Sequence, residues 1–233
     1  MSPEAITNLI KQVPLSDDAN EFISALDNVL DDILGKVSEA FVTKNPWDTI
    51  EKQLQMCYYN AWGEIRSADT FARQIEKLAF DYPELKLNVA RQLHDEMRHF
   101  KMYRDCAFQM GGEKDVFQTP EAEPLFNMFE HYDSIQDVLE EIICCQFISE
   151  RGALIFFKEA LKFDVHPTFR ATIERILPDE LFHVAIGRMA ARQFAKQGRA
   201  AQERILELVV RELKFPFQSI AAGREGEIPF IGF

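Results

Sequence analysis

The sequence is poor in cysteine, with four among 233 residues, and none of the four forms a Cys-x-x-Cys pair. This excludes a zinc ribbon and a rubredoxin-like iron site. The sequence also lacks a run of 18 apolar residues, the length typical of a bilayer-crossing helix. Its first residues, Met-Ser-Pro-Glu, lack the basic and apolar segments of a secretory signal. We therefore expect a cytoplasmic protein whose thiols are reduced and mostly buried.

Positive charge is scarce as well. Lysine and arginine total 26 against 38 aspartate and glutamate residues, which makes the formal net charge −12. A field of this sign repels phosphate, so we expect neither nucleic acid nor a membrane surface as a partner. Hydrophobic residues make up 47% of the chain, which is enough for a sizeable core. We expect a single domain over residues 1–233.

Glycine and proline number ten each and cluster at a few positions, and the alternating pattern typical of strands is absent from the sequence. Apolar residues recur instead with helical periodicity, which predicts an all-α fold. Ser16 and Ser134 are expected to cap helices, and a polar loop of about 20 residues is expected after Gly112. The predicted helices cover residues 4–12, 17–42, 47–80, 83–110, 134–163, 167–198 and 200–215, the last ended by Pro216.

The helices predicted at 47–80, 83–110, 134–163 and 167–198 have similar lengths and fall into two hairpins with a longer connection between them. This is the pattern of a ferritin-like four-helix bundle with one long crossover. Residues 47–198 would form the bundle, and residues 1–46 an N-terminal helical extension that covers it or makes a dimer. Residues 199–233 would form a C-terminal helix and a tail. Part of that tail, 223–233, is expected to fold over the site as a lid.

An internal repeat of the form Leu-x-Asp-Glu-x-x-His occurs at residues 93–99 and again at residues 177–183. Each copy lies on the second helix of a predicted hairpin. Residues three apart share one face of a helix, so Glu96 points with His99 and Glu180 points with His183. A carboxylate and an imidazole one turn apart can hold one metal ion. The alternative interpretation of each motif is a Glu-His pair on a solvated face.

Two further glutamates, Glu64 and Glu150, stand at the centre of apolar stripes on the helices predicted at 47–80 and 134–163. The glutamates that fall off these stripes are Glu51, Glu76, Glu140 and Glu159. Glu96 and Glu180 hold the equivalent central position on the other two helices of the bundle. Four carboxylates are thus predicted at mid-height in one core.

Burial of a single unpaired carboxylate is costly, and four would also repel one another. No lysine or arginine lies on the four stripes to neutralise them. Two divalent cations would balance the charge, and oxygen and imidazole ligands without thiolate suit iron or manganese. His94, His131 and His166 are expected to have no metal role. The predicted metal ligands and catalytic residues are Glu64, Glu96, His99, Glu150, Glu180 and His183.

This pattern resembles the ferritin-like carboxylate di-iron proteins, in which Glu and Glu-x-x-His alternate over four helices. Residues 95–99, Asp-Glu-Met-Arg-His, are also similar to the Asp-Glu-x-Arg-His signature of the oxygen-activating branch, which includes bacterial multicomponent monooxygenases and soluble acyl desaturases. The resemblance implies that Asp95 and Asp179 hold the Nδ1–H groups of His183 and His99, respectively. The second copy departs from the signature, because Phe182 stands where the signature has arginine.

The resemblance implies two iron ions as the cofactor, with manganese or a mixed Mn/Fe pair as an alternative. It implies an O2-dependent oxygenase or oxidase that hydroxylates, desaturates or N-oxygenates a small, apolar or aromatic organic molecule. A separate reductase or ferredoxin would supply electrons, and a homodimer is the expected assembly. The alternative functions are a ferroxidase or iron-binding ferritin-like protein, a manganese catalase or oxidase, and a helical scaffold that keeps a relic metal site.

Overall fold

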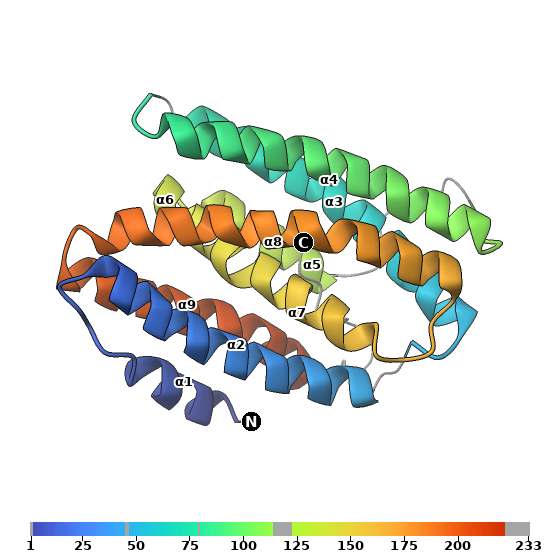
Figure 1. The fold of residues 1–233 in the computed structure, drawn as a ribbon, viewed down its shortest axis with the longest axis horizontal. Coiled ribbons are helices and arrows are strands. Elements are labelled where there is room, and N and C mark those ends of the chain that lie inside the picture. Colours follow the sequence, from blue (N-terminus) through green and yellow to red (C-terminus); the bar gives the residue numbers. More distant parts are fainter. Residues whose placement is uncertain (1, 45–46, 79, 114–122, 222–233) are drawn as a thin grey trace.

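The computed structural model describes residues 2–44, 47–78, 80–113 and 123–221, and these contain helices and no strands. The all-α prediction is therefore confirmed for this part of the chain. In chain order (Figure 1) the helices are α1 (Pro3–Lys11), α2 (Ala19–Lys44), α3 (Ile50–Leu78), α4 (Pro83–Gln109), α5 (Glu123–Ser134), α6 (Val138–Ile142), the π-helix η1 (Ile143–Ser149), α7 (Glu150–Ala160), α8 (Pro167–Ala195) and α9 (Arg199–Ala221).

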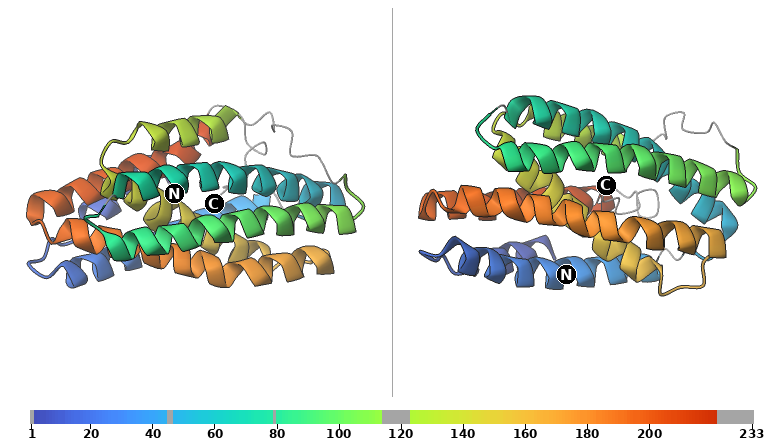
Figure 2. Two further views of the ribbon diagram at one scale, coloured as in Figure 1. Left: turned by 90° about the horizontal axis from the view of Figure 1, so that it is seen from above. Right: turned by 45° about the horizontal axis from the view of Figure 1, so that its top comes forward.

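The two predicted hairpins form the centre of the fold. One hairpin is α3 with α4, and the other pairs the α6–η1–α7 segment with α8. The hairpins meet where α4 packs on α8. Helix α2 lies on the far side of the second hairpin, against α7 and α8, so that three layers stack on one another (Figure 2). The N-terminal extension therefore covers the bundle within the same chain.

Proline and glycine begin and end the long helices as the sequence predicts. Pro83 and Pro167 lie in the first turns of α4 and α8, where the missing N–H group costs nothing. Gly111 and Gly198 follow α4 and α8 with φ angles of 90° and 117°, a conformation that only glycine adopts freely. The heights of α4 and α8, and of the two repeat motifs on them, are thus set by local sequence.

Three predicted helix boundaries are wrong. Ser134 does not cap the fourth bundle helix, because Asp137 accepts the N–H groups of Leu139 and Glu140 instead. Similarly, α2 begins at Ala19, after Asp18 rather than Ser16. The C-terminal helix continues through Pro216 to Ala221. A proline has a φ angle near the helical value and removes a single backbone hydrogen-bond donor. Helix α8 likewise contains a proline, Pro178, in its interior.

The expected loop between the hairpins contains a helix, α5, which the sequence analysis did not predict. Phe129 and Tyr132, one turn apart on α5, are both 2% exposed. Their burial gives a short polar segment enough apolar contact to be helical against α3. The expected lid, residues 223–233, lies outside the described residues.

The described helices include none that is both long and apolar enough to cross a lipid bilayer.

Close contact between α8 and η1 depends on Gly187. A Cβ atom at this position would lie 2.1 Å from the backbone nitrogen of Phe147 and 2.4 Å from the carbonyl carbon of Gln146. Real Cβ atoms do not approach backbone so closely, and neither backbone can yield without moving a helix. Gly187 therefore fixes the distance between α8, which carries Glu180, and η1, which leads directly into Glu150 at the start of α7.

Substitution Gly187→Ala is expected to lower the free energy of unfolding by about 2 kcal/mol or more, because the added methyl group forces η1 away from α8. Urea unfolding followed by circular dichroism measures the change. Gly35→Ala in α2 is the control, since no atom lies within 4 Å of its Cβ position. It should stabilise the protein by about 0.5–1 kcal/mol. Equal effects of the two substitutions would contradict the role of Gly187.

Candidate metal centre

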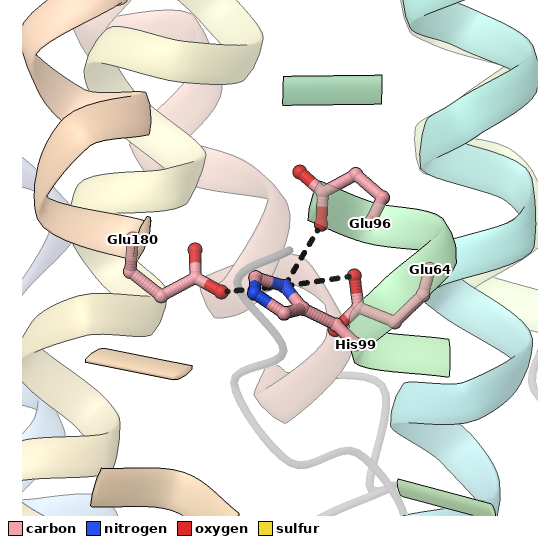
Figure 3. Close-up of side chains that lie close together, drawn as sticks. All are labelled: Glu64, Glu96, His99 and Glu180. Carbon is pink, nitrogen blue, oxygen red and sulfur yellow. Dashed lines mark hydrogen bonds and ion pairs between the residues drawn. The ribbon is translucent and has the colours of Figure 1, made fainter. Parts of the chain in front are cut away.

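The six predicted ligand residues lie together in the middle of the bundle. Glu64 comes from α3, and Glu96 and His99 come from α4. Glu150 is the first residue of α7, and Glu180 and His183 come from α8. Glu64 is 3% exposed, and the other five are at most 1% exposed. Figure 3 shows four of them, with the imidazole of His99 between three carboxylates.

The first half of the centre surrounds His99. Its Nδ1 atom lies 3.3 Å from Oε2 of Glu96, 3.4 Å from Oε1 of Glu180 and 4.0 Å from Oε2 of Glu64. One potential ligand atom from each of these four residues lies within 4.8 Å of the others (Figure 3). Three carboxylate oxygens and one imidazole nitrogen therefore converge on one point.

The second half repeats this arrangement around His183. Its Nδ1 atom lies 3.3 Å from Oε1 of Glu96, 3.3 Å from Oε2 of Glu180 and 3.9 Å from Oε2 of Glu150. Glu96 and Glu180 thus turn one oxygen toward each histidine, whereas Glu64 and Glu150 each serve one half. Glu96 and Glu180 thus lie between the two histidines, and Glu64 and Glu150 lie at the two ends of the cluster.

Unpaired buried oxygens show that these residues fit metal ions. Oε2 of Glu64, Oε2 of Glu150 and Oε1 of Glu180 are buried and have no hydrogen-bond partner in the described part of the chain. Buried polar atoms are paired in the great majority of cases, so this cluster of unpaired acceptors calls for a cation. The buried glutamates and histidines could therefore hold metal ions.

The pKa values indicate how the cluster is neutralised by protons. Burial raises the pKa of Glu64 and of Glu150, and the neighbouring carboxylates raise both further. Burial acts against charge on His99, but Asp179 and nearby glutamates outweigh it and raise the His99 pKa to about 9. The same balance, with Glu96 as the main partner, raises the His183 pKa to about 10. Protons and metal ions therefore compete for this cluster.

Two aspartates lie next to the histidines on the outer side of the cluster. Asp179 Oδ2 lies 3.3 Å from Nε2 of His99, and Asp95 Oδ2 lies 3.7 Å from Nε2 of His183. The predicted crosswise arrangement thus includes a hydrogen bond for His99 alone, because 3.7 Å is too long for one and neither Asp95 Oδ2 nor His183 Nε2 has a hydrogen-bond partner in the described residues. In both contacts the nitrogen is Nε2 and not the predicted Nδ1. In each histidine Nδ1 is nearer the backbone and contacts the glutamate one turn earlier on the same helix. Nε2 is therefore the nitrogen that faces the aspartate of the neighbouring helix.

A single arginine joins the two aspartates. The Arg98 side chain donates hydrogen bonds of 2.5 Å to Asp179 and 3.2 Å to Asp95. The matching position of the second repeat is Phe182. The guanidinium carbon of Arg91 lies over the Phe182 ring, 3.9 Å from the ring centroid. One guanidinium therefore fixes Asp179, which is hydrogen-bonded to His99, together with Asp95, which lies 3.7 Å from Nε2 of His183.

Gln92 is a residue of the centre that the sequence analysis missed. Its Nε2 atom donates to Oε1 of Glu96 at 3.1 Å and to Oε1 of Glu150 at 2.8 Å. It ties Glu96 to Glu150 through one oxygen of each, and the other oxygens, Glu96 Oε2 and Glu150 Oε2, face His99 and His183. The available signal was its position one turn before Glu96 on the same helical face.

The remaining histidines lie outside the cluster, as expected. His94 is exposed, with 77% of its side chain accessible. His131 Nε2 lies 2.8 Å from Glu212 of α9. His166 accepts the N–H group of Thr168 and caps α8.

No family model, curated protein or solved structure matches this chain. The resemblance to ferritin-like di-iron proteins therefore stands on the helical architecture and the buried cluster. Both are compatible with that fold.

Substitution Arg98→Gln is expected to weaken metal binding 10- to 100-fold, because Asp179, which is hydrogen-bonded to His99, and Asp95 lose their common partner. A competition titration against a chelating dye measures the affinity. Lys101→Gln is the control, since Lys101 is an exposed residue of the same helix. If both variants bind metal as tightly as the unaltered protein, Arg98 does not orient the centre.

Metal affinity is expected to rise with pH between pH 6 and pH 9. His99 and His183 carry protons in this range because their pKa values are about 9 and about 10. A metal ion must displace these protons, and displacement becomes easier as the proton concentration falls. Proton release on metal addition in weak buffer, read with an indicator dye, checks the sign. Binding without proton release would contradict the protonated state of the cluster.

Proposed function

We propose that this protein binds two iron ions and uses O2 to oxidise a small, apolar or aromatic organic molecule, as an oxygenase or oxidase. The observation that carries this proposal is the pair of shared carboxylates, Glu96 and Glu180, between two similar halves. Carboxylate oxygen and imidazole without thiolate is a ligand set that suits iron or manganese. Two ferrous ions side by side would supply O2 with two electrons at one place.

The chain's own residues would shape this chemistry in three ways. Glu96 and Glu180 would hold the two halves at a short, fixed separation. Glu64 and Glu150, each bound to one half, could change their attachment as charge builds up. Arg98 and its aspartates would keep the imidazoles in one orientation. Burial of all six ligand residues excludes bulk water, which suits a reaction with reactive intermediates.

The backbone beside Glu150 supports a functional role for this half of the centre. The preceding seven residues, Ile143–Ser149, form a π-helix. π-Helical turns strain the regular hydrogen-bond pattern and occur frequently at functional sites. Here the turn sets the direction in which Glu150 enters the core.

Hydroxylation of a substrate R–H would follow the balance R–H + O2 + 2 e⁻ + 2 H⁺ → R–OH + H2O. The electrons would come from a separate reductase or ferredoxin. A groove between α4 and α8 is a place where such a donor could dock, because Arg98, Lys101 and Arg175 line it with the single acid Asp105. It also lies directly outside the Arg98–Asp179–His99 series of contacts.

Glu150→Ala is expected to lower the iron content from two ions per chain to one or none, because one half loses its terminal carboxylate. Anaerobic titration with Fe(II), followed by metal analysis and Mössbauer spectroscopy, measures it. Glu159→Ala on the same helix is the control. Unchanged iron content in Glu150→Ala would remove Glu150 from the site.

Mixing the iron-loaded protein with O2 tests the reaction itself. A transient optical band within seconds, at two irons per chain, is expected of an oxygen-activating enzyme. Continued uptake of many irons with direct formation of ferric oxide would identify a ferroxidase instead. Tight binding of manganese in preference to iron would favour a manganese catalase or oxidase. No tight metal binding would leave a helical scaffold.

A further inference from the structure

Two of the four cysteines face each other across the first hairpin, α3 with α4 (Figure 1). Cys57 lies seven residues before Glu64 on α3, and Cys106 lies seven residues after His99 on α4. Seven residues are close to two helical turns, so each cysteine shares a helix face with its metal-centre residue. Glu64 Oε2 and His99 Nδ1 are 4.0 Å apart. Because α3 and α4 are antiparallel, Cys57 and Cys106 therefore also meet, about 10 Å farther along the hairpin.

The two thiols are in contact and differ in acidity. Both are free and lie in one apolar cluster, where Cys57 is 0% and Cys106 is 2% exposed. The Cys57 thiol donates a hydrogen bond to Cys106, and Cys106 Sγ in turn donates to Met110 Sδ at 3.6 Å. The bond from Cys57 lowers the pKa of Cys106 although burial opposes this effect. The same bond, together with burial, raises the pKa of Cys57. Cys106 is thus the sulfur that more readily becomes the nucleophilic thiolate.

One thiol of the pair is reached from the surface. Cys106, and not Cys57, lines the groove between α4 and α8, which has a volume of about 680 Å³. This volume is typical of sites for small molecules. Three cationic side chains line the groove with a single acid, Asp105, in a chain whose net charge is −12. The cations are Arg98, Lys101 and Arg175. The groove therefore attracts anions next to Cys106, whereas the protein as a whole repels them.

The other two cysteines differ from Cys106 in acidity and in access. Cys144 and Cys145 are neighbours in η1 and lie outside the groove. Burial raises the pKa of each well above its ordinary value. Cysteines that respond to oxidants combine a lowered pKa with access from solvent and a second thiol nearby. Among the four cysteines, Cys106 has this combination.

We propose that Cys106 and Cys57 form a redox-active dithiol, and that the groove binds the anionic, low-molecular-weight disulfide that oxidises it. The Cys106 thiolate attacks one sulfur of this disulfide, RSSR, which forms a mixed disulfide and releases one RS⁻ group. The Cys57 sulfur then attacks the Cys106 sulfur and displaces the second RS⁻ group. The two thiol protons pass to the released groups, so that the balance is 2 Cys–SH + RSSR → Cys–S–S–Cys + 2 RSH.

The product joins α3 to α4 by a covalent bond two turns from Glu64 and His99. An excess of RSH reverses the exchange and restores both thiols. The connection between the helices would therefore follow the ratio of disulfide to thiol in the surrounding solution. This proposal does not depend on the proposed function, because neither a metal ion nor O2 takes part in the exchange.

Glutathione disulfide is the probe, because it is a small disulfide that carries several carboxylates. The unaltered protein is expected to form the Cys57–Cys106 disulfide as its main product. Peptide mapping by mass spectrometry without reduction identifies the linked residues. Cys57→Ser is expected to stop after the first step and to keep glutathione on Cys106, because the second thiol is missing. Cys57→Ala serves if Cys57→Ser does not fold. Cys144→Ala is the control, and its yield of the Cys57–Cys106 disulfide should be unchanged.

A second experiment tests the charge of the groove. The double substitution Lys101→Gln and Arg175→Gln is expected to slow oxidation by glutathione disulfide about tenfold or more, because attraction of the anion is lost. Oxidation by the uncharged hydroxyethyl disulfide should change by less than about twofold. The control is Lys158→Gln with Lys196→Gln, which removes the same charge from exposed positions outside the groove. Alkylation of the remaining thiols at timed intervals, followed by mass spectrometry, gives the rates.

The proposal is overturned if glutathione disulfide leaves Cys57 and Cys106 as free thiols in the folded protein. A main product linked through Cys144 or Cys145 would overturn it as well, as would glutathione found elsewhere than on Cys106 in Cys57→Ser. Equal slowing of the two disulfides by the groove substitutions, or no slowing of either, would contradict binding of an anion in the groove.

Discussion

Mutual repulsion among the carboxylates of Glu64, Glu96, Glu150 and Glu180 is the force that the centre of this bundle has to balance. Their oxygens lie within contact distance of only two imidazoles, and solvent does not reach them. Protons can supply the missing positive charge, as the raised pKa values of His99 and both terminal glutamates indicate. Divalent cations can supply it without protonating the ligands. The same burial that makes the core costly to assemble therefore makes it selective for cations.

Groups of opposite charge alternate outward from the buried glutamates to the protein surface. Shared glutamates face the imidazoles, Asp95 and Asp179 face the outer ring nitrogens, and Arg98 closes both series at the surface. Each layer fixes the orientation of the one inside it, because a charged partner on one side of an imidazole decides which nitrogen remains for a metal. The DExRH sequence of α4 thus acts on both halves of the site, including the half contributed by α8.

Local patterns in the sequence were sufficient to predict the long helices and the ligand cluster. Proline and glycine ended the helices where backbone geometry demanded it, and glutamates in apolar stripes could only face the core. The wrong helix boundaries at Ser16, Ser134 and Pro216 are local errors, whereas the other failures depended on contacts between distant segments. Helix α5 becomes helical because Phe129 and Tyr132 are buried against other helices. The role of Gln92 depends on reaching Glu150, which is 58 residues away in the chain. The π-helix η1 has no periodicity signal, since all its residues but Ser149 are buried.

The repeat makes the two halves of the centre similar, and the departures from it make them chemically different. Only the first copy carries the arginine, and Asp179 lies closer to its histidine than Asp95 does. Only the second half adjoins the π-helix, through Glu150. Two ions held here would therefore have unlike surroundings, one beside the surface groove and one beside the π-helix. The departures from the internal repeat are consequently the residues through which this fold would be adapted to one reaction.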